Sequence, residues 1–186
     1  MVHVLADSYS NNYRMPPGRL QSGPRRDRKP REKSEFDQKT IDLARVTRVV
    51  AGGKRMRFRA CVVIGDRKGR VGMGLAKGVD VQGSIEKAVT SAKKHLITVV
   101  TERGTIPHVV NVKFRAARVL LKPAPTGSGV IAGGAARSVL DLAGIKDVVS
   151  KMLGSKNKIN NVQAVLLALS KLQPRKKQRD EKAAAS

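Results

Sequence analysis

A regular alternation of apolar and basic residues over positions 56–64 constrains the fold more than any other feature of the sequence. The apolar residues of one parity are Met56, Phe58, Ala60, Val62 and Ile64. Arg57 and Arg59 lie between the first three of them. Because successive side chains of a β-strand point to opposite faces, this segment predicts a strand with one apolar face and one basic face.

The flanking segments predict a small antiparallel sheet around this strand. Residues 46–50 are apolar enough for a preceding strand, and residues 51–55 contain the glycines of a turn. A second turn over residues 65–69 leads to a third strand, in which Val71, Met73 and Leu75 alternate with glycines. We therefore expect a three-stranded meander.

An amphipathic helix is expected after the third strand. The apolar residues that recur at helical spacing are Ile85, Ala88, Val89, Ala92 and Leu96. Lys87, Lys93 and Lys94 fall on the opposite side. The helix is expected to cover the apolar face of the sheet and to leave the other face exposed and basic. Residues 41–100 thus form a βββα domain.

The pattern restarts after a polar linker at residues 101–105. Val110 with Val112 and Val119 with Leu121 predict two strands. The remaining expected elements are a helix that follows the glycine-rich residues 127–134 and ends at Gly144, a strand over 145–153 and a helix over 162–172. Residues 105–172 are therefore predicted to form a ββαβα domain, and the whole chain belongs to the α+β class with two small domains.

The two ends of the chain are predicted to be flexible basic tails. Residues 1–40 mix Pro, Gly, Ser and charge without an apolar period, and residues 173–186 are similarly polar and basic. The N-terminus has no apolar stretch of a secretory signal, and no apolar run is long enough for a membrane span. A single cysteine, Cys61, excludes an internal disulfide and suits a reducing, cytoplasmic setting.

Charge indicates the class of partner. The 38 Lys and Arg residues exceed the 14 Asp and Glu residues and leave a net charge of +24. Residues 41–170 alone have 23 basic and 7 acidic residues, so the excess is not confined to the tails. A polyanion such as nucleic acid is the expected partner. The densest phosphate-binding candidates are Arg45, Arg48, Lys54, Arg55, Arg57, Arg59, Arg67, Lys68 and Arg70, with Asp66 as the one acid among them.

The glycine-rich residues 127–134 allow two interpretations. Free backbone N–H groups before a helix can bind an anion, and glycines can equally form a tight structural turn. The spacing G-x-G-x-x-x-G is one residue too long for the dinucleotide fingerprint, and no G-K-[ST] follows. The sequence therefore does not indicate a nucleotide enzyme.

Catalytic and metal-binding motifs are not found in the sequence. His3, His95 and His108 are scattered, and no acid pair or nucleophile lies near a histidine. We predict no metal, no cofactor, no small-molecule substrate and no enzymatic activity. Aromatic residues make up 3%, without Trp, which disfavours a protein that stacks single-stranded bases and favours backbone contacts to folded RNA.

Three ordered blocks of sequence closely resemble the bacterial S5 family of small-subunit ribosomal proteins. They are residues 45–55 (RVTRVVAGGKR), 63–74 (VIGDRKGRVGMG) and 127–135 (GSGVIAGGA). The resemblance covers about residues 40–172 and includes residues 154–160 (GSKNKIN), although Lys158 stands where many bacterial members have Pro. Neither tail matches the family.

The resemblance implies a first domain like double-stranded-RNA-binding folds and a protein that binds small-subunit rRNA. It implies that residues 47–54 lie near the spectinomycin site. It also implies that Gly129 and Arg137 lie at an interface with protein S4 that affects decoding accuracy, and that protein S8 is a further partner. With the resemblance included, the expected rRNA-binding residues also comprise Thr47, Gly52, Gly53 and Lys77.

The leading hypothesis is a structural rRNA-binding protein that stabilises the ribosomal head relative to the body and contributes to accuracy. The main alternative is a free nucleic-acid chaperone or a DNA-compacting protein, for which exchange is fast and no single RNA fold is required. An RNA-processing enzyme is the third hypothesis, and it lacks a catalytic motif.

Overall fold

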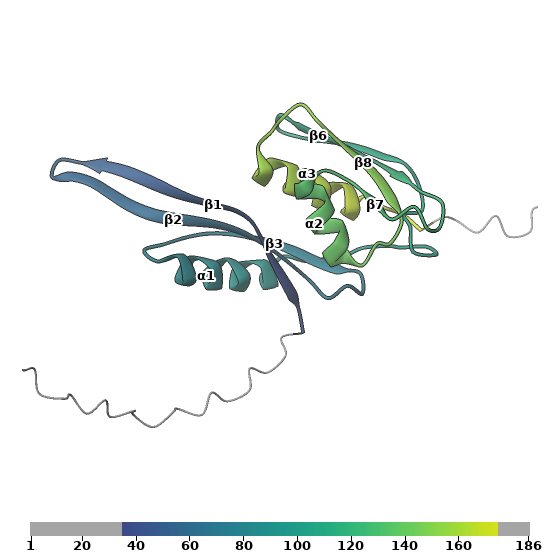
Figure 1. Ribbon diagram of the computed structural model, residues 1–186, viewed down its shortest axis with the longest axis horizontal. Coiled ribbons are helices and arrows are strands. Elements are labelled where there is room, and N and C mark those ends of the chain that lie inside the picture. The colour runs from purple at the N-terminus through teal and green to yellow at the C-terminus, as the bar shows by residue number, and fades with distance from the viewer. Residues whose placement is uncertain (1–34, 175–186) are drawn as a thin grey trace, which may run out of the picture. The chain divides into compact units, whose positions relative to one another are not determined.

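Antiparallel strand pairing organises residues 35–174, the part of the chain that the structure, a computed structural model, describes (Figure 1). Within this part, eight strands and three helices form two four-stranded sheets with their covering helices, which confirms the predicted α+β class. The predicted tails fall mainly on residues 1–34 and 175–186, outside the described residues. Because the first strand begins at Asp37, the folded part starts before residue 41.

The first sheet contains four antiparallel strands in sequence order. They are β1 (Asp37–Val50), β2 (Gly53–Gly65), β3 (Arg70–Gly78) and β4 (Leu96–Thr98), and helix α1 (Val81–Lys94) connects the last two. The alternating segment lies in β2, as predicted. Strand β4 was not predicted, and Leu96, which was assigned to the helix, is its first residue. Three residues directly after a helix are too few to display an alternation.

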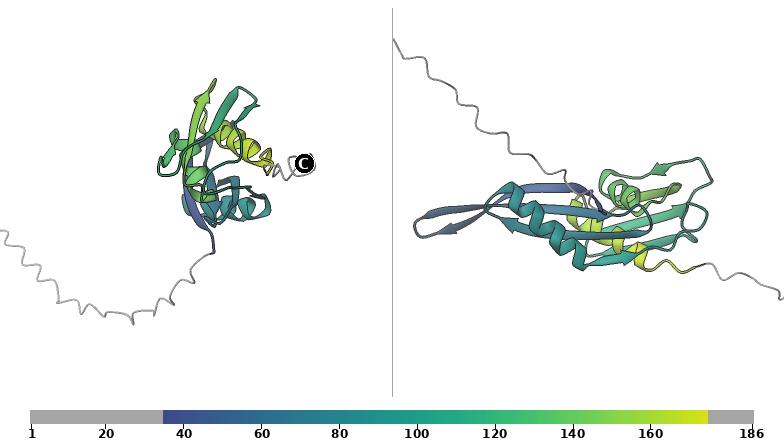
Figure 2. Two further views of the ribbon diagram at one scale, coloured as in Figure 1. Left: turned by 90° about the vertical axis from the view of Figure 1, so that its right-hand side faces the viewer. Right: turned by 90° about the horizontal axis from the view of Figure 1, so that it is seen from below.

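Helix α1 packs along one face of this sheet (Figure 2). One buried cluster joins the two elements through Ala60, Val62, Ile64, Ala88 and Ala92. Most of the β3 residues that face the helix are glycines, and a Cβ atom at Gly74 would clash with the carbonyl group of Ala88. A Cβ atom at Gly72 would approach the Ala92 carbonyl oxygen to 2.7 Å. The glycines of β3 therefore allow the helix to lie directly on the strand backbone.

The opposite face of the first sheet corrects one prediction. Instead of being exposed and basic throughout, it is covered by the second domain near the β2–β3 turn. Val63 and Val71 are fully buried there, in the same core as Val119, Val139 and other residues of the second domain. The basic, exposed part of this face is restricted to the end near Gly53. An alternation identifies side chains that share a face, but it does not report what a distant segment of the chain places on that face.

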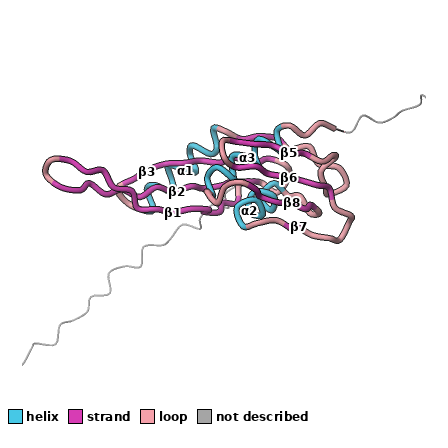
Figure 3. Tube along the Cα trace, turned by 90° about the horizontal axis from the view of Figure 1, so that it is seen from above, coloured by secondary structure: helices cyan, strands magenta, loops and turns pink. Residues whose placement is uncertain are grey.

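The second sheet has the strand order β5-β6-β8-β7 (Figure 3). Its elements are β5 (Val110–Phe114), β6 (Ala117–Pro123), β7 (Val130–Ile131), α2 (Gly134–Ala143), β8 (Val148–Leu153) and α3 (Lys158–Ser170). The predicted ββαβα order is present, with the two-residue strand β7 added inside the glycine-rich segment, where it pairs in parallel with β8. Helix α2 ends at Gly144 in the left-handed conformation, φ 82°, as expected for a C-terminal cap.

Backbone contacts join the two domains at the β2–β3 turn. The N–H groups of Arg67 and Gly69 donate hydrogen bonds to the carbonyl oxygens of Leu142 and Ala143, both 3.0 Å long. A Cβ atom at Gly65 would clash with the Leu142 carbonyl group. The turn is therefore inserted against the end of α2, and the two domains share a continuous core.

Asp66 organises this turn. Its carboxylate accepts hydrogen bonds from the backbone N–H groups of Lys68 (2.8 Å) and Arg70 (2.9 Å) and from the Arg70 guanidinium (2.7 Å). Burial raises the pKa of the Asp66 carboxyl, whose side chain is 6% exposed, but these hydrogen bonds outweigh it and lower the pKa from its ordinary 3.8 to about 2. The ionised carboxylate is thus part of the folded turn.

Asp66→Asn is expected to lower the free energy of unfolding at pH 7 by about 1.5–3 kcal/mol, because hydrogen bonds to a charged acceptor are lost. Because the folded pKa is depressed, the stabilisation by Asp66 is present above pH 4 and is lost as pH falls toward 2. Urea unfolding at pH 7 and pH 2.5 measures both values. Asp80→Asn is the control, since the side chain of Asp80 makes no capping hydrogen bond to α1. This role would be contradicted if both variants lost the same free energy of unfolding. It would also be contradicted if the difference in unfolding free energy between the parent and Asp66→Asn were as large at pH 2.5 as at pH 7.

Candidate nucleic-acid interface

A two-stranded arm extends from the first sheet (Figures 1 and 3). Strands β1 and β2 pair as far as Val50 and Gly53, whereas β2 pairs with β3 only from Phe58 onward. We call residues 45–57, which form a hairpin without a third strand, the basic arm. Gly53, with φ 125°, closes its turn in a conformation that other residues rarely adopt. This geometry explains why glycines stand at the centre of the predicted turn.

The pairing of the strands places several cations on the same face of the sheet, the face opposite to α1. Arg48 lies directly across from Arg55, and Arg59 lies across from Lys77 of β3. Arg57 has the same parity as Arg55, so it shares this face. Like charges directly opposite one another destabilise a sheet unless an anion lies between them. Residues 45–57 contain no acidic residue to supply that anion.

A groove of about 620 Å³ follows the basic arm, and most of its lining residues belong to this face. Its lining residues are Val46, Thr47, Arg48, Val50, Arg55, Met56, Arg57, Lys77 and Val79. The four cations among them are exposed, and the valines form apolar parts of the wall. The sequence predicted each of the four cations but did not indicate Val79, because nothing in the sequence shows that the end of β3 reaches the arm. A groove of this size and charge suits a phosphate backbone.

The other face of the basic arm corrects the assignment of Met56 to the core. Met56 pairs with Thr47 beyond the region that α1 covers, and it is 50% exposed. Val49, on the same face, is 73% exposed. Apolar residues continue to alternate along the strand beyond the part that α1 covers. An apolar residue there lies on the same face as the core residues but has no core to pack into. Arg45 and Lys54 lie on this face as exposed cations.

Arg59 takes part in a contact within the protein. Its guanidinium lies 3.4 Å from the Asp42 carboxylate, which in turn lies 3.4 Å from Nζ of Lys158 in the second domain. The side chain of Arg59 is also half-buried. Among the predicted rRNA-binding residues, Arg59 is therefore positioned to stabilise the junction of β1, β2 and α3.

Three further predicted residues lie at the opposite end of β2. Strand β2 has 13 residues, so the β2–β3 turn lies roughly 40 Å from the turn of the basic arm at residues 51–52. Arg67 lies 2.8 Å from the Asp37 carboxylate. Arg70 is paired with Asp66 and stacks on the ring of Phe36 at 5.2 Å. Lys68 is exposed. The predicted rRNA-binding residues thus lie mainly in two separate places. One group belongs to the basic arm, and the other belongs to the β2–β3 turn, where both arginines have partners within the protein.

The glycine-rich segment is explained by Asp147, a residue to which no sequence motif points. The buried Asp147 carboxylate accepts hydrogen bonds from the N–H groups of Gly127 (3.0 Å) and Gly129 (2.9 Å). Two N–H groups that might have bound an external anion are thereby occupied. Of the two interpretations, the tight structural turn fits this part of the segment, and φ values of 91° and 71° account for the two glycines.

Arg137 projects from the first turns of α2 into solvent. Its side chain is 63% exposed, and its guanidinium lies 4.0 Å from the carboxylate of Asp141, one helical turn later. An exposed pair of this length contributes little to stability. Arg137 lies near the N-terminus of α2, where the helix dipole disfavours a cation, and within the described part of the chain its pair with Asp141 compensates this effect only weakly.

Neither a metal site nor an activated thiol is found in the described residues. Among residues 35–174, no group of three or more His, Cys, Asp or Glu side chains is placed to hold a metal ion. Burial, followed by the charge of Asp42, raises the pKa of the Cys61 thiol to about 11, so the thiol is protonated at neutral pH. None of the helices in this part of the chain has the length and apolar character needed to cross a membrane.

Comparisons with known proteins agree with these features. The profile of ribosomal protein S5, N-terminal domain, matches residues 36–100, and that of ribosomal protein S5, C-terminal domain, matches residues 112–182. The family match therefore extends into both predicted tails, which corrects the expectation that neither tail matches. The small ribosomal subunit protein uS5 of Campylobacter jejuni subsp. jejuni serotype O:23/36 (strain 81-176) is 50% identical over 140 residues, which are 75% of this chain and 95% of the relative. The protein uS5c of Emiliania huxleyi is 49% identical over 139 residues, 74% of this chain and 87% of the relative.

Two α+β domains with a shared core and an exposed basic arm are features of a nucleic-acid-binding protein. The comparisons are more specific. The chain belongs to the ribosomal protein S5 (uS5) family, and it is a structural constituent of the small ribosomal subunit that serves translation.

Proposed function

We propose that the chain binds small-subunit rRNA chiefly through the basic arm. The observation that carries this proposal is the pairing of Arg48 with Arg55 in the strand register, with Arg57 and Lys77 beside them around a groove. Like charges brought this close require an anionic partner, and the regular phosphates of an RNA strand supply one. Gly52 and Gly53 lie at the turn and allow the backbone to approach that partner. Thr47 lies within the arm, paired with Met56, and lines the groove.

The second part of the proposal concerns position and partners. We infer from the family resemblance that the chain stabilises the head of the small subunit relative to its body and contacts proteins S4 and S8. The shared core supports this role. A protein whose two domains are joined rigidly limits the motion of the head relative to the body more than two loosely linked domains would. The separation of the basic arm from the second domain provides two ends that can contact different parts of the subunit.

Binding to the assembled subunit distinguishes this proposal from a free chaperone. We expect the full chain to co-sediment with small subunits through a sucrose gradient at high salt, and to bind isolated rRNA with a log K that falls by about 0.7–0.9 per log unit of salt for each phosphate neutralised. A chaperone or DNA-compacting protein would leave the subunit peak at high salt. If log K did not change with log salt concentration, binding through phosphate contacts would be contradicted.

A contribution to decoding accuracy is proposed for Gly129 and Arg137. The hydrogen bond from Gly129 to Asp147 holds the loop in one conformation, and Arg137 extends from the adjacent helix without a strong internal partner. We propose that an acidic group of protein S4 pairs with Arg137. The loop would then act as a rigid support for this interface.

Arg137→Leu is expected to raise stop-codon readthrough and near-cognate errors in cells that carry only the variant. The stability of the isolated protein should change by less than about 0.5 kcal/mol, because the residue is exposed and its pairing is weak. Lys171→Leu, which removes an exposed cation near the end of α3, serves as the control. Unchanged error rates together with normal subunit assembly would exclude the interface role of Arg137.

A further inference from the structure

The glycine-rich turn at residues 127–129 is held by one buried side chain. Asp147 is 6% exposed, and its Oδ1 atom accepts hydrogen bonds from the N–H groups of Gly127 (3.0 Å) and Gly129 (2.9 Å). The next residue, Val148, donates its N–H to the carbonyl oxygen of Gly129 at 3.2 Å. Gly129 is thus fixed through both its N–H and its carbonyl group. We call residues 127–129 the interface loop, because the proposed contact with protein S4 includes Gly129.

Side-chain packing does not hold the interface loop. A Cβ atom built at Gly127 or at Gly129 would have no heavy atom of another segment within 4 Å. Both glycines have positive φ, and the glycine backbone has wide conformational freedom. A carboxylate makes stronger hydrogen bonds than a neutral acceptor. The position of the Asp147 carboxylate therefore sets the position of the loop.

The backbone around Asp147 is bonded to the linker between the two domains. The N–H groups of Lys146 (2.9 Å) and Asp147 (3.1 Å) both donate to the carbonyl oxygen of Gly104. Gly104 lies in a tight turn, which is closed by two hydrogen bonds between Glu102 and Thr105, each 2.9 Å long. The linker follows β4 of the first sheet and leads to β5 of the second. Asp147 therefore contacts the linker with its backbone and the interface loop with its side chain.

The interface loop leads directly to the helix that carries Arg137. Strand β7 follows the loop and pairs in parallel with β8 through Val130 and Val148. Helix α2 begins at Gly134, and the N–H of Arg137 donates to the carbonyl oxygen of Gly133 at 2.8 Å. A displacement of the loop would therefore also move the start of α2.

We propose that Asp147 is a positioning residue for decoding accuracy, which holds the interface loop and Arg137 in place relative to the linker between the domains. Asp147 is buried and acts through the loop, without touching the partner itself. The inference rests on the proposed accuracy role of Gly129 and Arg137. It adds the residue that couples this interface to the connection with the first domain.

Decoding errors in cells that carry only the variant chain test this role. Asp147→Ala removes the acceptor and should raise stop-codon readthrough by about the same factor as Arg137→Leu. Asp147→Asn keeps an oxygen acceptor at the same place and should remain close to the parent protein. The double variant of Asp147→Ala with Arg137→Leu should misread no more than the more severe single variant, because both changes disrupt one contact. Errors in the double variant that equal the product of the two single effects would overturn the proposal.

Gly127→Ala perturbs the same contact from the loop side and leaves the buried carboxylate in place. A methyl group has room there, but a φ of 91° strains alanine. This variant should also raise readthrough, and amide exchange at Gly129 should accelerate more than exchange within α3. It keeps the test decisive if Asp147→Ala does not assemble into subunits. Parental readthrough in Gly127→Ala would contradict the positioning role.

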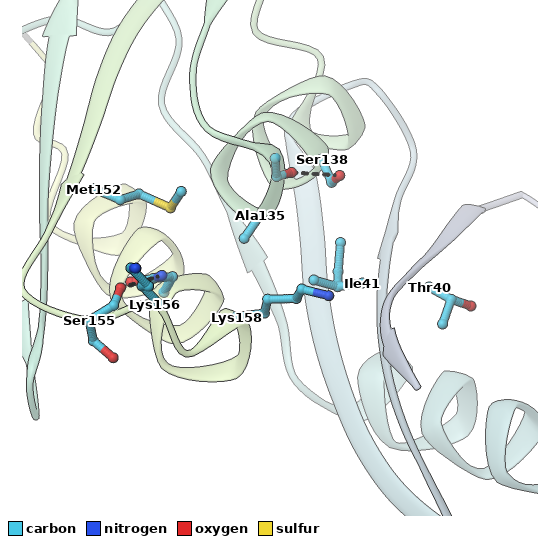
Figure 4. A pocket seen from close by; sticks show the side chains of 10 residues that line it. Thr40, Ile41, Ala135, Ser138, Met152, Ser155, Lys156 and Lys158 are labelled. Carbon is cyan, nitrogen blue, oxygen red and sulfur yellow. Dashed lines mark hydrogen bonds between the residues drawn. The ribbon is translucent and has the colours of Figure 1, made fainter. Parts of the chain in front are cut away.

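Two control variants separate the role of Asp147 from a general loss of stability. Val165 is fully buried in α3, so Val165→Ala lowers stability through a cavity. Ser138 is 5% exposed in α2, and its hydroxyl donates to the Gly134 carbonyl oxygen at 3.0 Å (Figure 4). It borders a pocket of about 490 Å³ between the start of β1 and the N-terminal ends of α2 and α3. Ser138→Ala removes a buried hydrogen bond without changing the interface loop, and both controls should keep parental accuracy.

The outcomes distinguish this proposal from the accuracy role itself. If Arg137→Leu raises readthrough but Asp147→Ala does not, the interface stands and the positioning role is wrong. If neither variant raises readthrough, both are wrong. If Val165→Ala raises readthrough as much as Asp147→Ala at an equal loss in urea midpoint, the effect reflects stability, and the positioning role is again wrong.

Discussion

Replacing Arg48, Arg55 and Arg57 together by Gln is expected to weaken binding of small-subunit rRNA about a hundredfold near physiological salt. Each phosphate contact contributes roughly 0.7–0.9 to the salt slope, so three contacts near 0.15 M salt amount to about two log units of affinity. The slope itself should fall by about two to three. Filter binding of isolated rRNA between 50 and 300 mM salt measures both quantities.

The same substitutions should not destabilise the fold. Arg48 and Arg55 are exposed and lie directly opposite each other, so removal of their mutual repulsion offsets any lost packing. Lys87, Lys93 and Lys94 on the outer side of α1 provide a matched control, because a triple Gln replacement there removes the same charge. An equal loss of affinity in both triple variants would show that binding depends on net charge and not on the basic arm.

Gly65→Ala is expected to lower the free energy of unfolding by about 3 kcal/mol, which is near the upper end of overpacking effects. A methyl group at this position would clash with the Leu142 carbonyl group, which belongs to the backbone and cannot rotate away, and a Cβ atom has no rotamer that avoids it. The change should also separate the β2–β3 turn from α2. Amide exchange at Arg67 and Gly69, which donate to Leu142 and Ala143, should accelerate more than exchange within α1.

Gly83→Ala is the matched glycine control. No atom lies within 4 Å of a Cβ atom built at Gly83 in α1, so the methyl group is accommodated there. Alanine is favoured over glycine in a helix by up to about 1 kcal/mol, and this variant should therefore be slightly more stable than the parent protein. Similar destabilisation in both variants would argue against a tight backbone contact at Gly65.

Hydrophobic periodicity alone predicted most of the strands and helices of this protein. A strand repeats every two residues and a helix every 3.6, and both repeats can be recognised in the order of the residues. The strand over residues 56–64, the cations on one side of it and the glycine stop at Gly144 all follow from that local order. Three cations of the groove, Arg48, Arg55 and Arg57, were likewise predicted from one-sided charge, whereas Lys77 was predicted only with the family resemblance. Composition indicated a polyanionic partner before any contact was known.

Tertiary structure decided which of these faces stay exposed and which charges have partners. Val63 and Arg57 have the same parity, yet the second domain buries one and leaves the other in solvent. The partner of Arg59 is Asp42, the partner of the Gly127 and Gly129 amides is Asp147, and Asn161 lines a pocket that β1 completes. Each of these relations joins segments distant in sequence. A local pattern contains no information about such contacts, since they depend on how the two domains pack together.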